Sequence, residues 1–326
     1  MSRWRRFDPA SLAVLGLLGI PSVFDHGPDW LRFFLLFPLL SLVPMLRTLR
    51  RGGGETDEND PLGYSRKTTV RFLFSQLIFG ITPWGFLTSI GQLVGQLVPL
   101  ARHRGSLPSP ETYDQRTTYR LPFDGDWLVV NGGVTRSESH SWSLYAQRYA
   151  HDFLQSVDGS THIGEGGDCE AYHCFGEPIL APASGTVVTA ADGLRDHPRP
   201  GTGWTEWRTW NILGNHVVVD HGDDEYSFLC HLQQGSVSVS AGETVEMGQR
   251  VGRCGNSGNS SEPHLHFHVQ DHPNFFLGAG VPVAFGEFER ERDGTNESVE
   301  PDYLTGGDTV RVRTAQMHTQ SREKPQ

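Results

Sequence analysis

Three histidines occupy alternate positions in the segment between Pro263 and Gln270, at His264, His266 and His268. Successive side chains of a β-strand point to opposite faces, so a strand here would place the three imidazoles on one face and the intervening apolar side chains on the other. Histidine is the commonest metal ligand in proteins, and it titrates near neutral pH. The spacing therefore indicates metal binding or acid–base chemistry. An exposed polar strand face that happens to carry histidines is the alternative.

The sequence around these histidines narrows the alternatives. The turn-forming segment 255–259 (GNSGN) precedes the predicted strand, and Cys230-His231-Leu232 ends an upstream apolar run. Residues 176–188 read GEPILAPASGTVV, and Gly214-Asn215 opens another apolar run. In this order, and together with PHLHF at residues 263–267, these segments resemble the lysostaphin-like (LytM-type) zinc metallopeptidases, which are best known as peptidoglycan endopeptidases. The resemblance covers about residues 120–270, close to half of the chain.

The resemblance implies a role for each matching residue. The second histidine of the family's H-x-H motif is a zinc ligand, which here is His266, and the first is a catalytic histidine, which here is His264. His231, at the end of the middle strand, matches the family's other catalytic histidine. The family's aspartate ligand matches Asp152 in the segment QRYAHDF, residues 147–153.

The third protein ligand is where this sequence departs from the family. A histidine usually stands four residues before the aspartate, and here that position is Arg148. His140 resembles the ligand of a family variant in which a loop separates the histidine from a Q-R-Y-A-x-D-F strand. His151 is a second candidate, although its adjacency to Asp152 would turn it to the opposite face of a strand. A zinc site without a third protein ligand is the remaining alternative.

The implied ligand set is suited to hydrolysis. Two imidazoles and one carboxylate leave the fourth tetrahedral position of Zn²⁺ open for water, as catalytic zinc sites require. Zinc lowers the pKa of such a water toward about 7 and polarises the scissile carbonyl. His264 would act as general base or orient the water, and His231 would stabilise the oxyanion or protonate the leaving amine. The expected substrate is a peptide or a cell-envelope polymer that contains peptide bonds.

Two other functions stay open at this point. Members of the family that lose a ligand act as non-catalytic binding or activator modules, and Arg148 at the usual ligand position keeps that alternative in view. Phosphocarrier domains of sugar transport also place histidines near a G-x-x-x-x-A-P-x-x-G turn such as the one that begins at Gly176. The upstream Asp152 and an anchor in the membrane are not expected of a phosphocarrier.

The elements that would position these residues are predicted to be strands. Short apolar runs separated by Gly, Pro, Asn and Asp follow one another from Tyr119 onward, and no long amphipathic pattern interrupts them before residue 286. This pattern predicts a mostly β, antiparallel domain over residues 119–312, and the resemblance implies a lysostaphin-like fold with a metal-site groove. The clearest runs are residues 126–131, 185–189, 215–220, 226–232 and 264–269.

Three apolar stretches precede this domain, at residues 11–24, 30–46 and 72–100. The third carries no charged residue and is long enough to span a bilayer, whereas the first two are slightly short. Basic residues precede the first stretch and fill the loop before the third, which puts both groups on the cytoplasmic side by the positive-inside rule. Residues 1–104 are therefore expected to be a helical transmembrane anchor in contact with membrane lipid, with the β domain outside the cell. A buried helical hairpin is the alternative.

The remaining segments are expected to be irregular. Residues 105–118 are polar and contain proline, which is typical of a linker, and residues 313–326 have the composition of a disordered tail. The chain has four cysteines, which would form two disulfides in an exported domain or remain buried thiols. If disulfides form, Cys230 could pair with Cys254, and Cys169 and Cys174 could close their own loop.

The net charge of the 326-residue chain is −11, which argues against a nucleic-acid partner because phosphate backbones bind basic surfaces. Residues 1–104 carry 12 basic and 7 acidic side chains (net +5), whereas residues 105–326 carry 15 and 31 (net −16). Dense acidity with few lysines is typical of proteins that work in high salt, and we hypothesise a halophilic host. We expect residues 105–326 to unfold more easily in low salt than in molar KCl. Equal resistance to denaturant in the two solutions would contradict the hypothesis.

Overall fold

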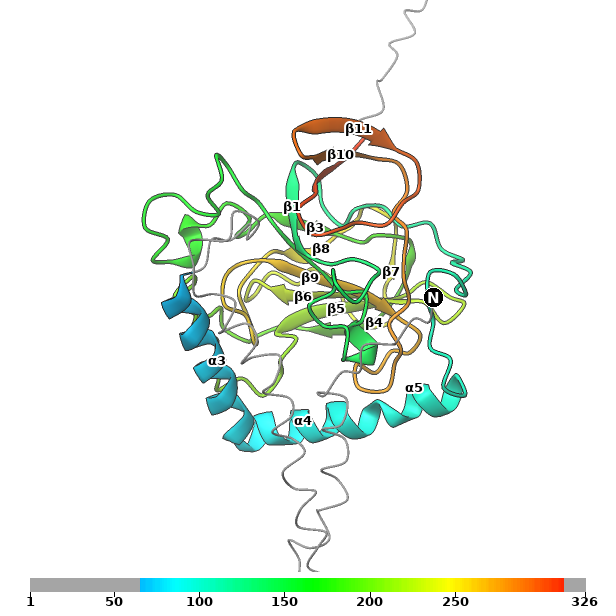
Figure 1. Ribbon diagram of the computed structural model, residues 1–326, viewed down its shortest axis with the longest axis horizontal. Helices are drawn as coiled ribbons and strands as arrows, with labels where there is room; N and C mark the ends of the chain where they lie inside the picture. Colours follow the sequence, from blue (N-terminus) through cyan, green and yellow to red (C-terminus); the bar gives the residue numbers. More distant parts are fainter. Residues whose placement is uncertain (1–64, 314–326) are drawn as a thin grey trace, which may run out of the picture.

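The computed structural model describes residues 65–313 (Figure 1). Its main element is a ten-stranded sheet in which every strand pair is antiparallel. In sheet order the strands are β11 (Thr295–Val299), β10 (Phe288–Arg292), β12 (Thr309–Val312), β1 (Trp127–Asn131), β2 (His151–Leu154), β9 (Leu265–Gln270), β6 (Tyr226–Leu232), β5 (Asn215–Asp220), β4 (Gly185–Ala191) and β7 (Thr244–Val245). A second sheet pairs β3 (Pro178–Leu180) with β8 (Arg250–Arg253). The prediction of a mostly antiparallel β domain is confirmed.

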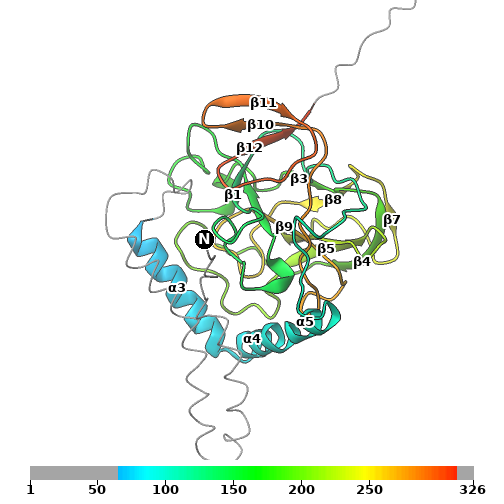
Figure 2. The ribbon, with the colours of Figure 1, turned by 45° about the vertical axis from the view of Figure 1, so that its right-hand side comes forward.

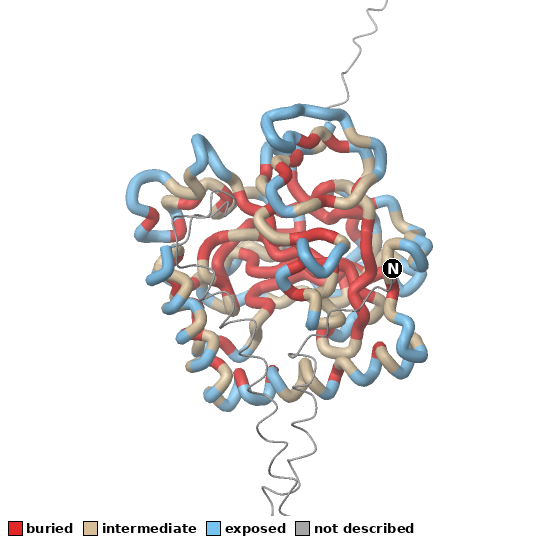
Figure 3. The backbone as a smooth tube through the Cα atoms, in the orientation of Figure 1, coloured by how far each residue is buried: buried red, intermediate tan, exposed pale blue. Residues whose placement is uncertain are grey.

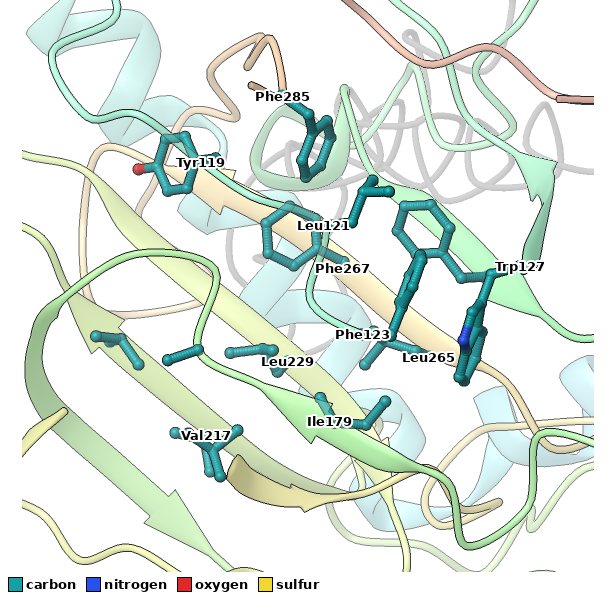
Figure 4. Packing of buried hydrophobic residues seen from close by; sticks show 14 of the residues in the cluster. Tyr119, Leu121, Phe123, Trp127, Ile179, Val217, Leu229, Leu265, Phe267 and Phe285 are labelled. Atoms are coloured by element: carbon teal, nitrogen blue, oxygen red, sulfur yellow. The ribbon is translucent and has the colours of Figure 1, made fainter. Parts of the chain in front are cut away.

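The main core packs one face of the large sheet against β3, β8 and the segment 119–123 (Figure 4). Strand β9 shows the predicted alternation, because Leu265, Phe267 and Val269 are at most 1% exposed and belong to this core. Burial of a side chain such as Phe267 contributes about 2 kcal/mol. A shift of β9 by one residue would turn these apolar side chains out of the core. The core therefore fixes which face of the sheet the histidines occupy.

The opposite face of the sheet carries the histidines and a smaller apolar cluster built around Phe228 and Phe275. Three helices pack on this side: α3 (Arg66–Ile81), α4 (Pro83–Gly95) and α5 (Leu97–Arg102) (Figure 2). Two short 3-10 turns, η3 (Tyr145–Gln147) and η4 (Cys169–Ala171), are the other helical segments among the described residues. Figure 3 shows the central strands of the sheet buried, the β10–β11 hairpin largely exposed, and the helices largely exposed along their outer sides.

The predicted apolar stretch 72–100 is divided between these helices and does not form one straight helix. The Thr82 side chain accepts a hydrogen bond from Gly85 N, and Pro83 begins α4, where its missing N–H costs no helical hydrogen bond. Within the described part of the chain, no single helix is long and apolar enough to cross a membrane; the bent pair Arg66–Ile81 and Pro83–Arg102, at 89°, meets that test only when taken together. The stretches 11–24 and 30–46 and residues 314–326 of the predicted tail lie outside the described residues.

The predicted linker, residues 105–118, is attached to the β domain through one buried carboxylate. Glu225 accepts hydrogen bonds from the hydroxyls of Tyr113 and Tyr119 and from the backbone N–H groups of Arg116 and Thr117. Burial alone would raise the pKa of Glu225, but these hydrogen bonds lower it below its ordinary value. The segment therefore leads from the helices into the sheet along a fixed path.

All four cysteines are free and buried, so neither predicted disulfide forms. The cysteines are buried thiols instead, which was the alternative expectation. Burial raises the pKa of Cys169 to about 12 and that of Cys230 beyond the ordinary thiol range. These thiols pack as small apolar side chains.

Candidate metal centre

Asp152 and His266 face each other across two adjacent strands. In the antiparallel pair of β2 and β9, Asp152 is the direct register partner of His266. Such cross-strand partners have Cβ atoms about 5 Å apart, close enough for their side chains to meet. Asp152 Oδ1 lies 2.8 Å from His266 Nδ1, and both residues are buried.

His140 reaches the same place from the loop between β1 and β2. Its Nε2 lies 3.5 Å from Asp152 Oδ2, and 35% of its side chain remains exposed. The neighbouring Ser139 Oγ donates a 2.7 Å hydrogen bond to Arg148 O, which ties this part of the loop to its end. The candidate ligand atoms of His140, Asp152 and His266 all lie within 4.8 Å of one another. The structure thus brings together the three residues that the sequence predicted as ligands.

The Asp152 carboxylate is held in its charged form. Burial would raise its pKa, but the neighbouring His140, His266 and His264 lower it well below the ordinary value. Asn131 Nδ2 donates a 3.0 Å hydrogen bond to Asp152 Oδ2, from a position where the β1–β2 register shifts. A buried, ionised carboxylate next to several imidazoles is the donor set that a divalent cation such as Zn²⁺ prefers.

A chain of hydrogen bonds fixes the tautomer of His266. Gln270 Nε2 donates to the backbone carbonyls of His272 and Asn274, at 2.6 and 3.0 Å, which uses both of its hydrogens. Gln270 Oε1 must then accept from His268 Nε2, 3.3 Å away. His268 Nδ1 is consequently an acceptor, and it faces His266 Nε2 at 3.2 Å. His266 therefore carries a hydrogen on Nε2.

This tautomer leaves His266 Nδ1 with a lone pair directed at the charged Asp152. Two acceptors 2.8 Å apart repel each other unless a proton or a cation lies at that position. A proton would make His266 an imidazolium, whereas a metal ion would be held by Nδ1 together with the carboxylate. The residues present therefore fit Zn²⁺, and the ligand assignment itself stays a prediction.

We expect His268→Ala to weaken zinc binding by about 10- to 100-fold, because His268 orients a ligand without touching the metal position. His268→Gln should recover most of the affinity, since an amide oxygen can accept the same hydrogen bond from His266 Nε2. Zinc affinity measured by competition with a chromogenic chelator tests this expectation. His173→Ala, at a histidine outside the groove, is the matched control. Wild-type affinity in His268→Ala, or equal losses in both His268 variants, would contradict the orienting role.

His264 and His231 are held in the tautomer that suits a general base. His264 Nδ1 donates to the carbonyl of Glu262 and His231 Nδ1 to the carbonyl of Ser257, each at 2.8 Å. Because a carbonyl can only accept, both Nε2 atoms keep a free lone pair. The two rings lie side by side, with centroids 4.8 Å apart. Burial lowers the pKa of His264, and burial together with the neighbouring histidines lowers the pKa of His231 far below its ordinary value.

The glycine-rich segment 255–259 allows this arrangement by close backbone approach. A Cβ atom on Gly255 would lie 2.2 Å from the backbone N of Gln233, directly after the end of β6. Ser257 Oγ donates a 2.6 Å hydrogen bond to the carbonyl of Leu232. His231 itself adopts φ +62°, a conformation that costs a non-glycine residue about 1 kcal/mol or more and is often found at functional sites.

His151, the second candidate for the third ligand, and Arg148, at the position where the family usually has a histidine, both lie away from the cluster. His151 turns to the opposite face, where its Nε2 lies 3.4 Å from the carbonyl of Leu304, and burial lowers its pKa to about 4. The guanidinium of Arg148 stacks over the rings of Trp142 and Tyr145, at 4.8 and 5.0 Å from their centroids. Arg148 thus occupies the usual ligand position in sequence but does not enter the group of candidate ligands.

A groove of about 870 Å³ runs over the candidate metal centre. One wall is the β domain, which contributes His140, Asp152, His231, His264 and His266. The other wall comes from α3 and α4, through side chains that include Phe72, Gln76, Phe79, Thr88 and Gln92. The groove is large enough to hold several residues of an extended peptide.

Sequence reasoning did not find the groove residues of α3 and α4. Gln76, Thr88 and Gln92 are polar side chains inside an uncharged apolar stretch. Polar residues in such a stretch tend to face protein or a cavity, so their positions were the available signal. Asn131 and His268 were also missed as partners of the ligands, because their hydrogen bonds depend on strand register and on a turn.

Part of the chain is similar in sequence to known proteins. Residues 162–276 match the model of Peptidase family M23. The chain is 31% identical to peptidoglycan DD-endopeptidase ShyA of Vibrio cholerae over 172 residues, which are 52% of this chain and 31% of that protein. It is 27% identical to lysostaphin of Staphylococcus simulans over 165 residues, which are 47% of this chain and 29% of that protein. The chain thus spans less than a third of the length of either relative.

Solved structures match the chain at lower sequence identity. The catalytic domain of lysostaphin from Staphylococcus simulans is 20% identical, and the alignment covers 52% of this chain and 90% of that domain with a TM-score of 0.27.

The family match begins at residue 162, after His140 and Asp152, so two of the three candidate ligands lie upstream of it.

Proposed function

We propose that the chain, whose residues 162–276 match Peptidase family M23, is a zinc metallopeptidase that hydrolyses peptide bonds in a cell-envelope polymer. The observation that carries the proposal is the convergence of His140, Asp152 and His266 beside two further histidines in one groove. Peptidoglycan is the proposed polymer because a relative that is 31% identical over the matched segment is a peptidoglycan DD-endopeptidase.

His140, Asp152 and His266 would hold the metal, which when bound supplies an acidified water and polarises a carbonyl. His264 Nε2, with its lone pair free, would accept a proton from the attacking water. His231 Nε2, on the neighbouring ring, would stabilise the developing negative charge once protonated or pass a proton to the leaving amine. The extended groove would hold the peptide across these groups.

The location that we propose is the cell membrane, with the β domain on the outer side. The motivation is the sequence of residues 1–104, with its apolar stretches and basic flanking residues. Cysteine labelling of a position on the β domain, such as Met247→Cys, in intact cells tests this location. Protection from a membrane-impermeant reagent until the cells are lysed would contradict it.

The function is tested with the full chain in detergent micelles. Purified peptidoglycan and glycine-rich peptides are incubated with the protein, and new amino termini are counted with and without a zinc chelator. Hydrolysis that the chelator abolishes would support the proposal. Zinc binding without hydrolysis of any substrate would favour the alternative, a non-catalytic binding or activator module on the same fold.

A further inference from the structure

The helices α3–α5 carry their large apolar side chains outward. Of the fifteen exposed large apolar side chains among the described residues, eleven lie between Val70 and Val98. Ile81 is 77% exposed, and Phe86 and Leu87 are 58% and 57% exposed. Ten of the eleven do not line the groove: Val70, Phe74, Leu77, Ile81, Trp84, Phe86, Leu87, Val94, Leu97 and Val98. The eleventh, Phe72, lines the groove. A helix on the surface of a water-soluble domain shows the reverse pattern, with its apolar stripe facing the core.

The most buried positions of the same helices are mainly small or polar residues. The buried positions are Ser75, Phe79, Gly85, Thr88, Gly95 and Pro99. Only one of these six is a large apolar side chain. Small residues and hydrogen-bonding side chains at contact faces are typical of helices whose outer surface meets lipid, because in lipid apolar burial no longer drives packing.

Direct contacts tie these helices to the β domain. Ser75 Oγ lies 3.1 Å from Thr205 Oγ1, and both residues are fully buried. The side-chain amides of Gln76 and Asn259 exchange two hydrogen bonds, at 3.1 and 3.0 Å. A Cβ atom on Gly95 would lie 2.1 Å from the carbonyl oxygen of Phe276, so the helix and the loop touch through their backbones. The outward face is therefore a fixed surface of the folded protein.

Charge is arranged at the two ends of this surface. Arg66, Lys67 and Arg71 lie in the first turns of α3, and Arg104 follows the end of α5. Arg102, the last residue of α5, forms an ion pair with Asp271 at 2.9 Å and is not counted among these cations. Residues 72–100 between them carry no charge. An apolar surface flanked by basic residues complements a bilayer that contains anionic lipid, whose acyl chains take the apolar part and whose head groups pair with the cations.

We propose that the outward face of α3–α5 is embedded in an anionic lipid bilayer. The bent helix pair then serves two purposes at once, because its outer side contacts lipid while its inner side forms a wall of the groove over His140, Asp152 and His266. In this arrangement α3–α5 lie along the bilayer and do not cross it, so the lipid contact is independent of the side of the membrane proposed for the β domain. The groove is consequently held at the membrane surface, within reach of peptides presented there. The lipid contact does not depend on the chain being a peptidase.

The proposal is tested with spin labels on the full chain, reconstituted in vesicles of phosphatidylcholine and phosphatidylglycerol. Leu77→Cys, Ile81→Cys and Phe86→Cys place a label on the outward face, while Trp210→Cys and Met247→Cys place it at apolar positions of the β domain that are 59% and 53% exposed. We expect collisions with dissolved oxygen to exceed those with a water-soluble nickel chelate at the first three positions, and the reverse at the two controls. Because the readout is local, it does not depend on how residues 1–64 associate with the vesicles.

Three results would overturn the proposal. Nickel accessibility at the outward positions equal to that of the controls would mean that the face meets water. Protection from both reagents together with dipolar broadening between labels would mean that a second copy covers it. Protection from both without broadening would mean that another segment of the chain covers it. Wild-type zinc content and circular dichroism of each variant establish that the labelled protein is folded.

Discussion

His266→Ala is expected to lose stoichiometric zinc and to lower peptide-bond hydrolysis by about 10³-fold or more. The substitution removes the Nδ1 atom that lies 2.8 Å from Asp152 Oδ1, at the centre of the candidate ligand group. Bound metal contributes several kcal/mol of charge stabilisation in such reactions, and each 1.36 kcal/mol corresponds to a factor of ten in rate. Metal content is measured by mass spectrometry on the same preparation that is assayed for new amino termini.

Two further variants make this result specific to the ligand group. His140→Ala should have the same direction of effect, because His140 is the third candidate ligand. Asp152→Asn keeps the size of the side chain but removes its charge, and it should also lose the metal. His173→Ala, outside the groove, should keep both metal and activity. Full zinc and full activity in His140→Ala would show that another group completes the site.

His264→Ala is expected to keep zinc and to lower kcat by about 10²- to 10⁴-fold, the range that a general base contributes. The reason is that His264 lies beside the ligands but outside the group of atoms that lie within 4.8 Å of one another. Its Nδ1 hydrogen is used on the Glu262 carbonyl, so only its Nε2 is available for proton transfer. Steady-state kinetics and zinc content of the same sample separate the two effects.

The matched comparison for His264→Ala is His231→Ala, at the neighbouring ring. Both should retain zinc, and partial recovery of His264→Ala activity by added imidazole would identify a lost proton acceptor. Loss of zinc in His264→Ala would instead make His264 a ligand. An undiminished kcat in both variants would show that neither histidine takes part in catalysis.

The strand that carries the histidines could be predicted from the sequence because apolar residues and histidines alternate along it. Leu265, Phe267 and Val269 must face one way to enter the core, and this places the histidines on the other face. The pairing of Asp152 with His266 followed from the family resemblance, and the register of β2 and β9 agrees with it.

Other features depend on contacts between distant segments, which a single sequence does not display. The apolar stretch 72–100 bends at Thr82 and Pro83, and its polar Gln76 pairs with Asn259, 183 positions further along the chain. The tautomer of His266 is set through His268 and Gln270 by carbonyls of a turn that follows the strand. The composition of residues 72–100 predicts an apolar segment, but only the packing of its helices shows which side faces the groove.

The proposed zinc peptidase activity is tested most directly by removing zinc from one preparation of the intact chain and then adding it back. Hydrolysis of peptidoglycan is measured on the protein as purified, after dialysis against a chelator, and after zinc is added back. We predict activity at the start, its loss after dialysis and its recovery with zinc, with the His266→Ala variant inactive throughout. Hydrolysis that persists after the metal is gone, or that is equal in His266→Ala, would contradict the assignment of His140, Asp152 and His266 as the metal centre of a peptidase.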